Sequence, residues 1–418
     1  MLFQDMTDTA QTERATGVSA ASPLPIAAQL AEAPVGLLKF AKLAGRNMLE
    51  VIPIETTTQT YLKGPLNIHY ICDPEIITEL LVGAGRRFPK AQFTKDILGS
   101  AVGNSMMLSE GEKWKEQRRR YSPLFAARNL PMLCQHFAET GKEIAASLRE
   151  GPGFVDVAQM APAATLTNIS RVIFSGNEEV SAEQIRVGLR NYFEYISNIS
   201  LFDVMGLPSW IPRKKWFYSK APVTDMRALA RQVIESRRSE SRPIPLDFLD
   251  LMIAALEEDF EDIETTVDNL LTFVVAGHET SANAMAWGAY LLALHPDQQA
   301  AIQKEISAVS PKEPITFEDL ENMPLLRAHT KETLRLYPSA AFFARDAGED
   351  ITIKDIKFAK GDALFFPVYS LHRNRELWSD PDAYKPERFL DAPRPAASIF
   401  RLGTAHVSAL ARNTPKPK

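Results

Sequence analysis

The feature that most constrains the fold is a long stretch, Ile263 to His295, that is apolar on nearly every side. This distribution predicts a helix buried all round in the centre of a large domain. Gly277 lies in its middle, although glycine in a helix interior costs about 1 kcal/mol relative to alanine. Other small residues recur at Ala276, Ala282 and Gly288. They indicate that something flat and bulky lies against the helix, or only that another helix packs closely, and both alternatives stay open.

The remaining pattern predicts a mainly α fold with small β-sheets. Helical periodicity dominates from Pro74 to Val309, whereas apolar and polar residues alternate from Thr56 to Cys72 as in a small sheet. β-branched and aromatic residues return at Ile351 to Ile353 and at Ala363 to Val368, which indicates further strands near the end of the sequence.

Composition limits the domain organisation and the function. The chain has 418 residues and is 45% hydrophobic, enough for one large core. No linker or composition break divides its middle, so we expect a single large domain over residues 25–399, after a disordered tail at 1–24. A net charge of -5 with short basic runs argues against a general nucleic-acid binder. Without a visible secretory signal or a bilayer-spanning apolar run, we expect a cytoplasmic, soluble protein.

Two groups of polar residues stand out from this pattern. Glu279 and Thr280 follow Gly277 inside the apolar helix, where a carboxylate and a hydroxyl need a polar partner or water. A bond from Thr280 to a carbonyl one turn earlier is the structural alternative to a chemical role. Glu332 and Arg335 are spaced i, i+3 on a helix expected from about Leu325 to Tyr337, so they share one face.

Further candidates lie on either side of the apolar helix. Trp114 and Arg118 are one helical turn apart, and this indole and guanidinium suit an amphipathic helix as well as a binding site. Arg345 follows the helix of Glu332, and Arg388 lies in a Pro-Glu-Arg-Phe sequence at 386–389.

In this order, Ala-Gly-His-Glu-Thr-Ser at 276–281, Glu332-x-x-Arg335 and Pro-Glu-Arg-Phe resemble the cytochrome P-450 family of haem-thiolate monooxygenases, of the bacterial soluble type. The resemblance covers roughly Thr60 to Leu390. It implies the single-domain cytochrome P-450 fold and haem b as the cofactor. It also implies an apolar small-molecule substrate and electrons from a separate partner of the ferredoxin, flavodoxin or reductase type.

The resemblance also implies roles for individual residues. Glu279 and Thr280 are expected on the oxygen-binding side of the haem, where they relay protons during catalysis. Ala276 and Gly277 are expected beside the cofactor. His278 matches a variable position. The haem propionates are held by Trp114, Arg118 and Arg345, and a buried structural network is made by Glu332, Arg335 and Arg388.

The sequence departs from the family after Phe389. The family continues into a loop whose cysteine ligates the haem iron, but Phe400 to Ala411 contains no cysteine. We therefore expect no metal ligand and no thiolate-ligated haem in this chain, and a fold that lacks the cysteine loop, the proximal helix and the terminal sheet. Cys72 and Cys134 are expected to be buried structural thiols, and His406 an adventitious surface residue.

A lost base explains this departure. If one base is restored before the Arg401 codon, a permitted codon choice for residues 401–411 translates as Pro-Phe-Gly-Asp-Gly-Pro-Arg-Leu-Cys-Ile-Gly, which matches the missing signature. Residues 400–418 are thus interpreted as a frameshifted tail and residues 25–399 as an incomplete cytochrome P-450 domain.

Two functions from different classes follow. The first is a haem-dependent monooxygenase, inactive as written because its axial cysteine is missing. The second is a non-catalytic remnant, or a helical small-molecule-binding protein without haem; a helical module unrelated to haem would require every motif to be accidental. The aromatic segment Phe202 to Tyr218 is interpreted as part of a lid and indicates only an apolar substrate.

Overall fold

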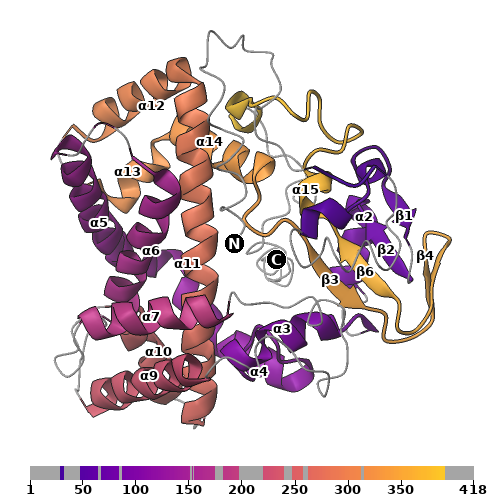
Figure 1. Cartoon of the computed structure of the whole chain (residues 1–418), viewed down its shortest axis with the longest axis horizontal. Helices are drawn as coiled ribbons and strands as arrows, with labels where there is room; N and C mark the ends of the chain where they lie inside the picture. The colour runs from indigo at the N-terminus through magenta and orange to yellow at the C-terminus, as the bar shows by residue number, and fades with distance from the viewer. Residues whose placement is uncertain are drawn as a thin grey trace, which may run out of the picture. The chain divides into compact units, whose positions relative to one another are not determined.

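Figure 1 shows the computed structural model of the chain. It describes residues 29–32, 48–64, 67–83, 87–150, 153, 155–174, 182–196, 220–239, 247–257, 262–311 and 315–390. The predicted tail at 1–24, the aromatic segment at 202–218 and the segment at 400–418 lie outside these described residues.

The described chain forms two compact units. Unit 1 holds the described residues up to Lys95 and from Ala328 onward, and unit 2 holds those between Asp96 and Arg327. Both of these boundaries fall inside helices, α3 (Gln92–Val102) and α14 (Pro324–Leu336). The sequence predicts one domain because helical residues continue through both boundaries, so neither carries the composition of a linker.

Unit 1 is built around a four-stranded sheet in the order β1-β2-β6-β3. The outer pairs β1/β2 and β3/β6 are antiparallel, and the central pair β2/β6 is parallel, with Tyr70 opposite Phe365. Four strands lie in the stretches where the sequence predicts them: β1 (Tyr61–Lys63) and β2 (Ile68–Ile71) in the alternating stretch, and β4 (Ile351–Ile353) and β6 (Ala363–Phe366) nearer the end. The sequence did not predict β3 (Phe343–Asp346) or β5 (Ile356–Phe358), which pairs with β4 in a separate hairpin.

Both faces of this sheet are apolar, because successive side chains point to opposite sides of a strand. On one face Tyr70 and Phe365 meet edge to face, with ring centroids 5.6 Å apart. On the other, Phe366 stacks on Phe343 at 4.5 Å within a cluster that includes Leu364. The helical elements of unit 1 are η1 (Met48–Val51), η2 (Ile54–Thr57), α2 (Pro74–Thr78), the π-helical turn η3 (Glu79–Gly83), α15 (Val368–Leu371) and η8 (Pro386–Phe389).

Unit 2 is helical in its described residues, and its longest helix is α11 (Ile263–Leu294), which packs chiefly along α6 (Val157–Phe174) (Figure 1). Asp262 caps the start of α11 by accepting the Glu264 backbone N–H. The other helices are α4 (Gly111–Tyr121), η5 (Ser122–Phe125), η6 (Ala127–Asn129), α5 (Leu130–Glu150), α7 (Ala182–Ile196), α9 (Ala221–Ser239), α10 (Phe248–Glu257), α12 (Pro296–Val309) and α13 (Phe317–Glu321).

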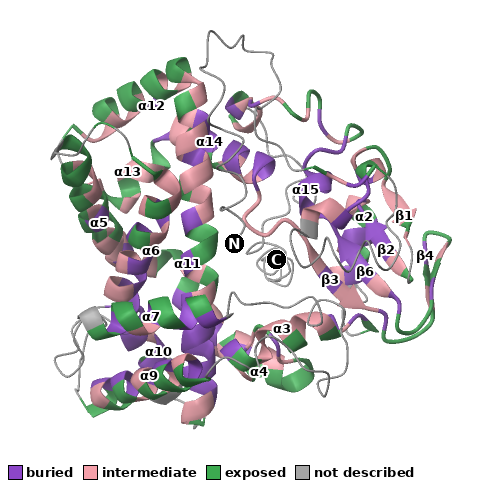
Figure 2. Ribbon diagram, viewed as in Figure 1, coloured by how far each residue is buried: buried purple, intermediate pink, exposed green. Residues whose placement is uncertain are grey.

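The predicted central helix is confirmed as α11, but it is not buried along its whole length. All residues from Thr265 to Thr272 are buried, whereas exposed residues appear from Ala276 onward (Figure 2). The first part belongs to the main core of unit 2, which contains Val267, Leu270 and Leu271. The second part carries the motif residues on a side that solvent reaches.

Among the helices of the described ranges, none is both long and apolar enough to cross a bilayer.

Candidate functional site

The motif on α11 presents small and polar groups along one exposed side. Ala276, Glu279 and Thr280 are exposed, whereas His278 and Ala282 are buried, so the helix turns one polar face outward at this point. The Thr280 hydroxyl donates to the Ala276 carbonyl oxygen one turn earlier, at 2.5 Å. This is the structural arrangement that the sequence left open.

Glu279 has an unusual environment for an exposed residue. Solvent reaches its side chain, yet enough protein surrounds the carboxyl group that burial raises the pKa of Glu279 above its ordinary value. The accessible area belongs to the whole residue, whereas the pKa responds to the surroundings of the carboxyl group itself. A carboxyl group with a raised pKa exchanges protons closer to neutral pH, as a general acid requires.

His278 points the other way and is a packing residue. Its Nδ1 lies 2.9 Å from the Thr165 hydroxyl of α6, and its ring lies 4.3 Å from that of Phe193 on α7. Burial lowers the pKa of His278 to about 4. The imidazole is therefore a neutral, hydrogen-bonded part of the core.

Trp114 and Arg118 contact each other on α4. The Arg118 guanidinium carbon lies 5.3 Å from the centre of the Trp114 ring, and burial lowers the pKa of Arg118. A guanidinium that is half-buried against an aromatic ring has lost part of its hydration, so it is well suited to a carboxylate ligand.

A network that the sequence did not predict fixes the loop before α4. The Asp268 carboxylate on α11 accepts the Asn104 backbone N–H at 2.7 Å, and the Asn269 side chain accepts the Met106 N–H at 2.9 Å. Arg227 of α9 donates to Asp268 at 2.6 Å. A polar Asp-Asn pair in the apolar first half of α11 is the signal that could have revealed this network. It ties α9, α11 and the loop together within unit 2.

Arg345 lies in β3 of unit 1, opposite Leu364 of β6 and bridged on its other side to Lys90. Its side chain is half-buried. The proposed propionate residues are thus divided between the units, with Trp114 and Arg118 in unit 2.

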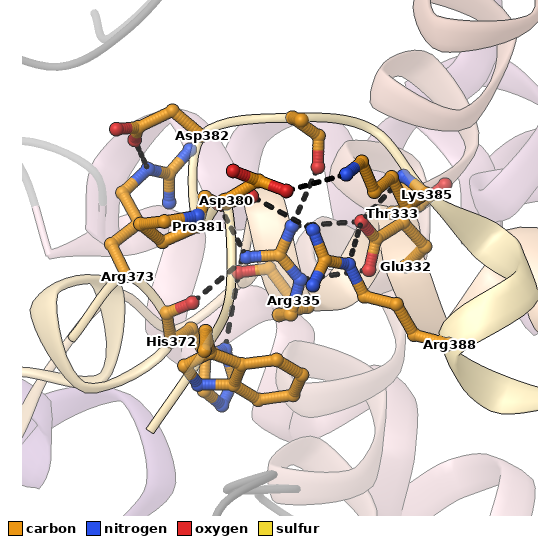
Figure 3. Close-up of polar contacts among 12 residues, drawn as sticks. Glu332, Thr333, Arg335, His372, Arg373, Asp380, Pro381, Asp382, Lys385 and Arg388 are labelled. Atoms are coloured by element: carbon orange, nitrogen blue, oxygen red, sulfur yellow. Dashed lines mark hydrogen bonds and ion pairs between the residues drawn. The ribbon is translucent and has the colours of Figure 1, made fainter. Parts of the chain in front are cut away.

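Glu332 and Arg335 form a bidentate ion pair inside unit 1 (Figure 3). Arg335 donates from Nε and Nη2 to the two Glu332 carboxylate oxygens, both at 2.7 Å, and both side chains are 0% exposed. Glu332 also accepts the Lys385 backbone N–H at 2.8 Å. The exposed pair of little energetic value, which the spacing alone allowed, is excluded by this burial.

The rest of the network consists of contacts, mostly hydrogen bonds, that hold residues 372–388 against α14. Arg335 donates to the carbonyl oxygens of His372, Pro381 and Ala383, and lies 5.0 Å from the Trp378 ring centre. The third member joins from η8: the Arg388 Nε lies 3.5 Å from Glu332 Oε1, and its terminal nitrogens donate to the carbonyls of Ser379 and Asp380. The structure thus brings Glu332, Arg335 and Arg388 together.

The described residues are suited to contact the periphery of a haem, but neither cysteine among them is suited to ligate its iron. The exposed side of α11 and the Trp114–Arg118 pair offer polar contacts to such a group. Cys72, by contrast, is 1% exposed in the unit 1 core, and burial raises its pKa. Cys134 on α5 is half-buried, a correction to its expected burial, and its pKa is also raised chiefly by burial. A thiol of raised pKa is a poor source of thiolate. Within the ranges described, no three His, Cys, Asp or Glu side chains cluster as metal ligands do.

Comparison with known proteins agrees with this arrangement. The family model described as Cytochrome P450 matches residues 57–401. Human Cytochrome P450 3A5 is 27% identical over 396 residues, covering 89% of this chain and 76% of the relative. Human Cytochrome P450 4F2 is 27% identical over 357 residues, covering 78% and 68%. The Cytokinin hydroxylase of Arabidopsis thaliana is 28% identical over 352 residues, covering 78% and 66%.

Solved structures show the same fold. A crystal structure of a cytochrome P450 (CYP102L1) is similar with a TM-score of 0.63 and 25% identity, covering 77% of this chain and 72% of that chain. A zebrafish cytochrome P450, in a structure with abiraterone, has a TM-score of 0.65 over 89% and 88% of the two chains. At 19% identity, that likeness shows the fold alone.

Proposed function

Since this chain belongs to the cytochrome P450 family, whose members are haem monooxygenases, we propose that its α11 and α4 residues serve haem-dependent insertion of one oxygen atom into an apolar small molecule. The observation that carries this proposal is the polar side of α11. There Glu279 has a raised pKa and Thr280 is exposed, on a helix whose first part is buried in the core of unit 2.

Each residue has a distinct task. Haem, when bound, supplies the iron centre at which dioxygen is reduced. Arg118 donates hydrogen bonds to a propionate carboxylate while Trp114 holds its guanidinium in place, and Arg345 provides a second cation. The Glu279 carboxyl group and the Thr280 hydroxyl hold and pass on protons. Ala276 keeps the space beside them open because its side chain is only a methyl group.

Hemin titration tests the propionate contact. Adding hemin quenches tryptophan fluorescence, so the apparent dissociation constant can be measured without turnover. Replacing Arg118 by Gln is expected to raise this constant roughly tenfold, because a charge-assisted hydrogen bond contributes about 1.5 kcal/mol or more. Arg119→Gln is the matched control, since Arg119 is the next residue and is exposed. Equal effects of the two substitutions would contradict the proposal.

The iron ligand separates the first function from its alternative. We propose that this 418-residue chain, whose only cysteines are Cys72 and Cys134, does not form a thiolate-ligated haem. As written it would then be a non-catalytic remnant or a helical small-molecule-binding protein. The reduced, carbon-monoxide-bound spectrum tests this: a stable, strongly red-shifted Soret band of the thiolate type would contradict it.

The gene provides the complementary test of the frameshift. Adding one base before the Arg401 codon is expected to open a frame containing the cysteine loop, and its product should show the red-shifted band. A shifted frame with an early stop, or without a cysteine within about a dozen codons, would leave the tail unexplained. A separate ferredoxin, flavodoxin or reductase partner and a cytoplasmic location remain predictions. Reconstituted turnover with purified partners and cell fractionation check them.

A further inference from the structure

A second polar site lies in unit 1, beside the Glu332–Arg335 pair. Arg373 follows α15, and its side chain is only 6% exposed. Its guanidinium carbon lies 3.8 Å from the Tyr369 ring centre and 5.9 Å from that of Tyr337. The aromatic rings cover the cation without accepting strong hydrogen bonds, so its N–H groups need other acceptors.

Two buried polar atoms here have no hydrogen-bond partner within the described part of the chain. They are Nη1 of Arg373 and the hydroxyl oxygen of Ser370, a residue that is 0% exposed. The Arg373 backbone N–H donates to the Ser370 carbonyl at 2.9 Å, so a single turn of the chain brings the two residues close together. Buried donors are almost always satisfied in folded proteins, and an unsatisfied one indicates a bound water or ion.

The local charge favours an ion over a water. The nearest carboxylate to Arg373 is that of Asp382, whose Oδ1 lies 3.5 Å from Nε and whose side chain is 57% exposed (Figure 3). Arg335 is a second buried cation near Arg373, but the charge of Arg335 is already neutralised by its bidentate ion pair with Glu332. Among the described residues, the charge of Arg373 therefore lacks a close, buried counterion, which is costly in a protein interior.

From this geometry we propose that Arg373 and Ser370 form a buried binding site for a small anion of the chloride class. The guanidinium Nη1–H and the serine O–H donate to the anion, which neutralises Arg373.

Thermal unfolding at constant ionic strength tests the site, with sodium chloride replacing sodium gluconate stepwise. The midpoint is expected to rise with chloride and to saturate, because a ligand that binds only the folded state stabilises it by mass action. Arg373→Gln should abolish the chloride dependence. Arg87→Gln, which removes an exposed arginine of the same unit, should keep it. A chloride response that is absent from the wild type, or unchanged in Arg373→Gln, overturns the proposal.

Ser370→Ala provides a variant that should fold even if Arg373→Gln does not. It should raise the apparent dissociation constant for chloride about tenfold, since one hydrogen bond to an ion is lost. In gluconate it should be at least as stable as the wild type, because a buried hydroxyl without a partner has been removed. Bromide provides the structural readout: an anomalous peak within hydrogen-bond reach of both atoms supports the site, and density without anomalous signal identifies water and overturns it.

Discussion

Glu332→Ala tests whether the network in unit 1 carries the stability of that unit. The substitution removes a carboxylate that accepts two bonds from Arg335 and one from the Lys385 N–H, all within 2.8 Å. Arg335 remains at 0% exposure, so its charge is left in the interior without a counterion. Breaking a buried pair from one side costs about 3–5 kcal/mol, which is a large fraction of the stability of most domains.

The assay is urea unfolding, followed by circular dichroism and by tryptophan fluorescence. The urea midpoint of Glu332→Ala should fall with little change in the slope m, because the substitution alters stability and not the surface exposed on unfolding. Glu349→Ala is the matched control: Glu349 pairs with Arg87 on the surface, with both side chains about half exposed. It should change the free energy of unfolding by less than about 1 kcal/mol. A change below about 0.5 kcal/mol for Glu332→Ala would refute the reasoning.

Two further predictions concern unit 2. Gly103 has a φ of 52°, and a Cβ there would lie 2.2 Å from the Asp268 carboxylate, so Gly103→Ala should cost about 3 kcal/mol or more in a denaturant titration. Gly111→Ala shares the positive φ of 60° but meets nothing within 4 Å, so it should cost only about 1–2 kcal/mol, and equal costs would contradict the clash. His278 has a folded-state pKa of about 4, below its ordinary 6.5, so the unfolded state takes up a proton first as the pH falls. Protonation of His278 in the unfolded state should therefore lower the free energy of unfolding by up to about 3 kcal/mol as the pH falls from 6.5 to 4. His278→Gln should remove this part of the pH dependence of the free energy of unfolding.

The sequence predicts elements that show a helical or strand periodicity and pairs of residues that are close along the chain. It does not predict contacts between residues that only the folded structure brings together. The apolar run that became α11 and the alternating strands of unit 1 follow local periodicity. The i, i+3 spacing of Glu332 and Arg335 placed them on one face, but their burial depends on residues 372–388. Only the family resemblance connected Arg388 with them.

The loop network of unit 2 shows what sequence reasoning missed. Asp268 and the Asn104 N–H are 164 residues apart, so no local pattern relates them. The same applies to Arg227, which joins Asp268 from α9. The need for glycine at position 103 likewise depends on a distant residue. A residue without a Cβ is required there because the Asp268 carboxylate lies so close.

The structure bears on one of the two explanations of Gly277, the close packing of another helix. A Cβ added there would lie 3.6 Å from Ile169 Cδ1 of α6, an ordinary contact, so close packing of that helix does not require glycine. Thr280 bonds the Ala276 carbonyl across the same turn, and such back-bonding weakens or bends a helix. Both residues thus lower the intrinsic stability of α11 where its polar groups are exposed. Gly277→Ala should therefore raise the free energy of unfolding by up to about 1 kcal/mol. Destabilisation in a denaturant titration would show instead that helix packing requires the glycine.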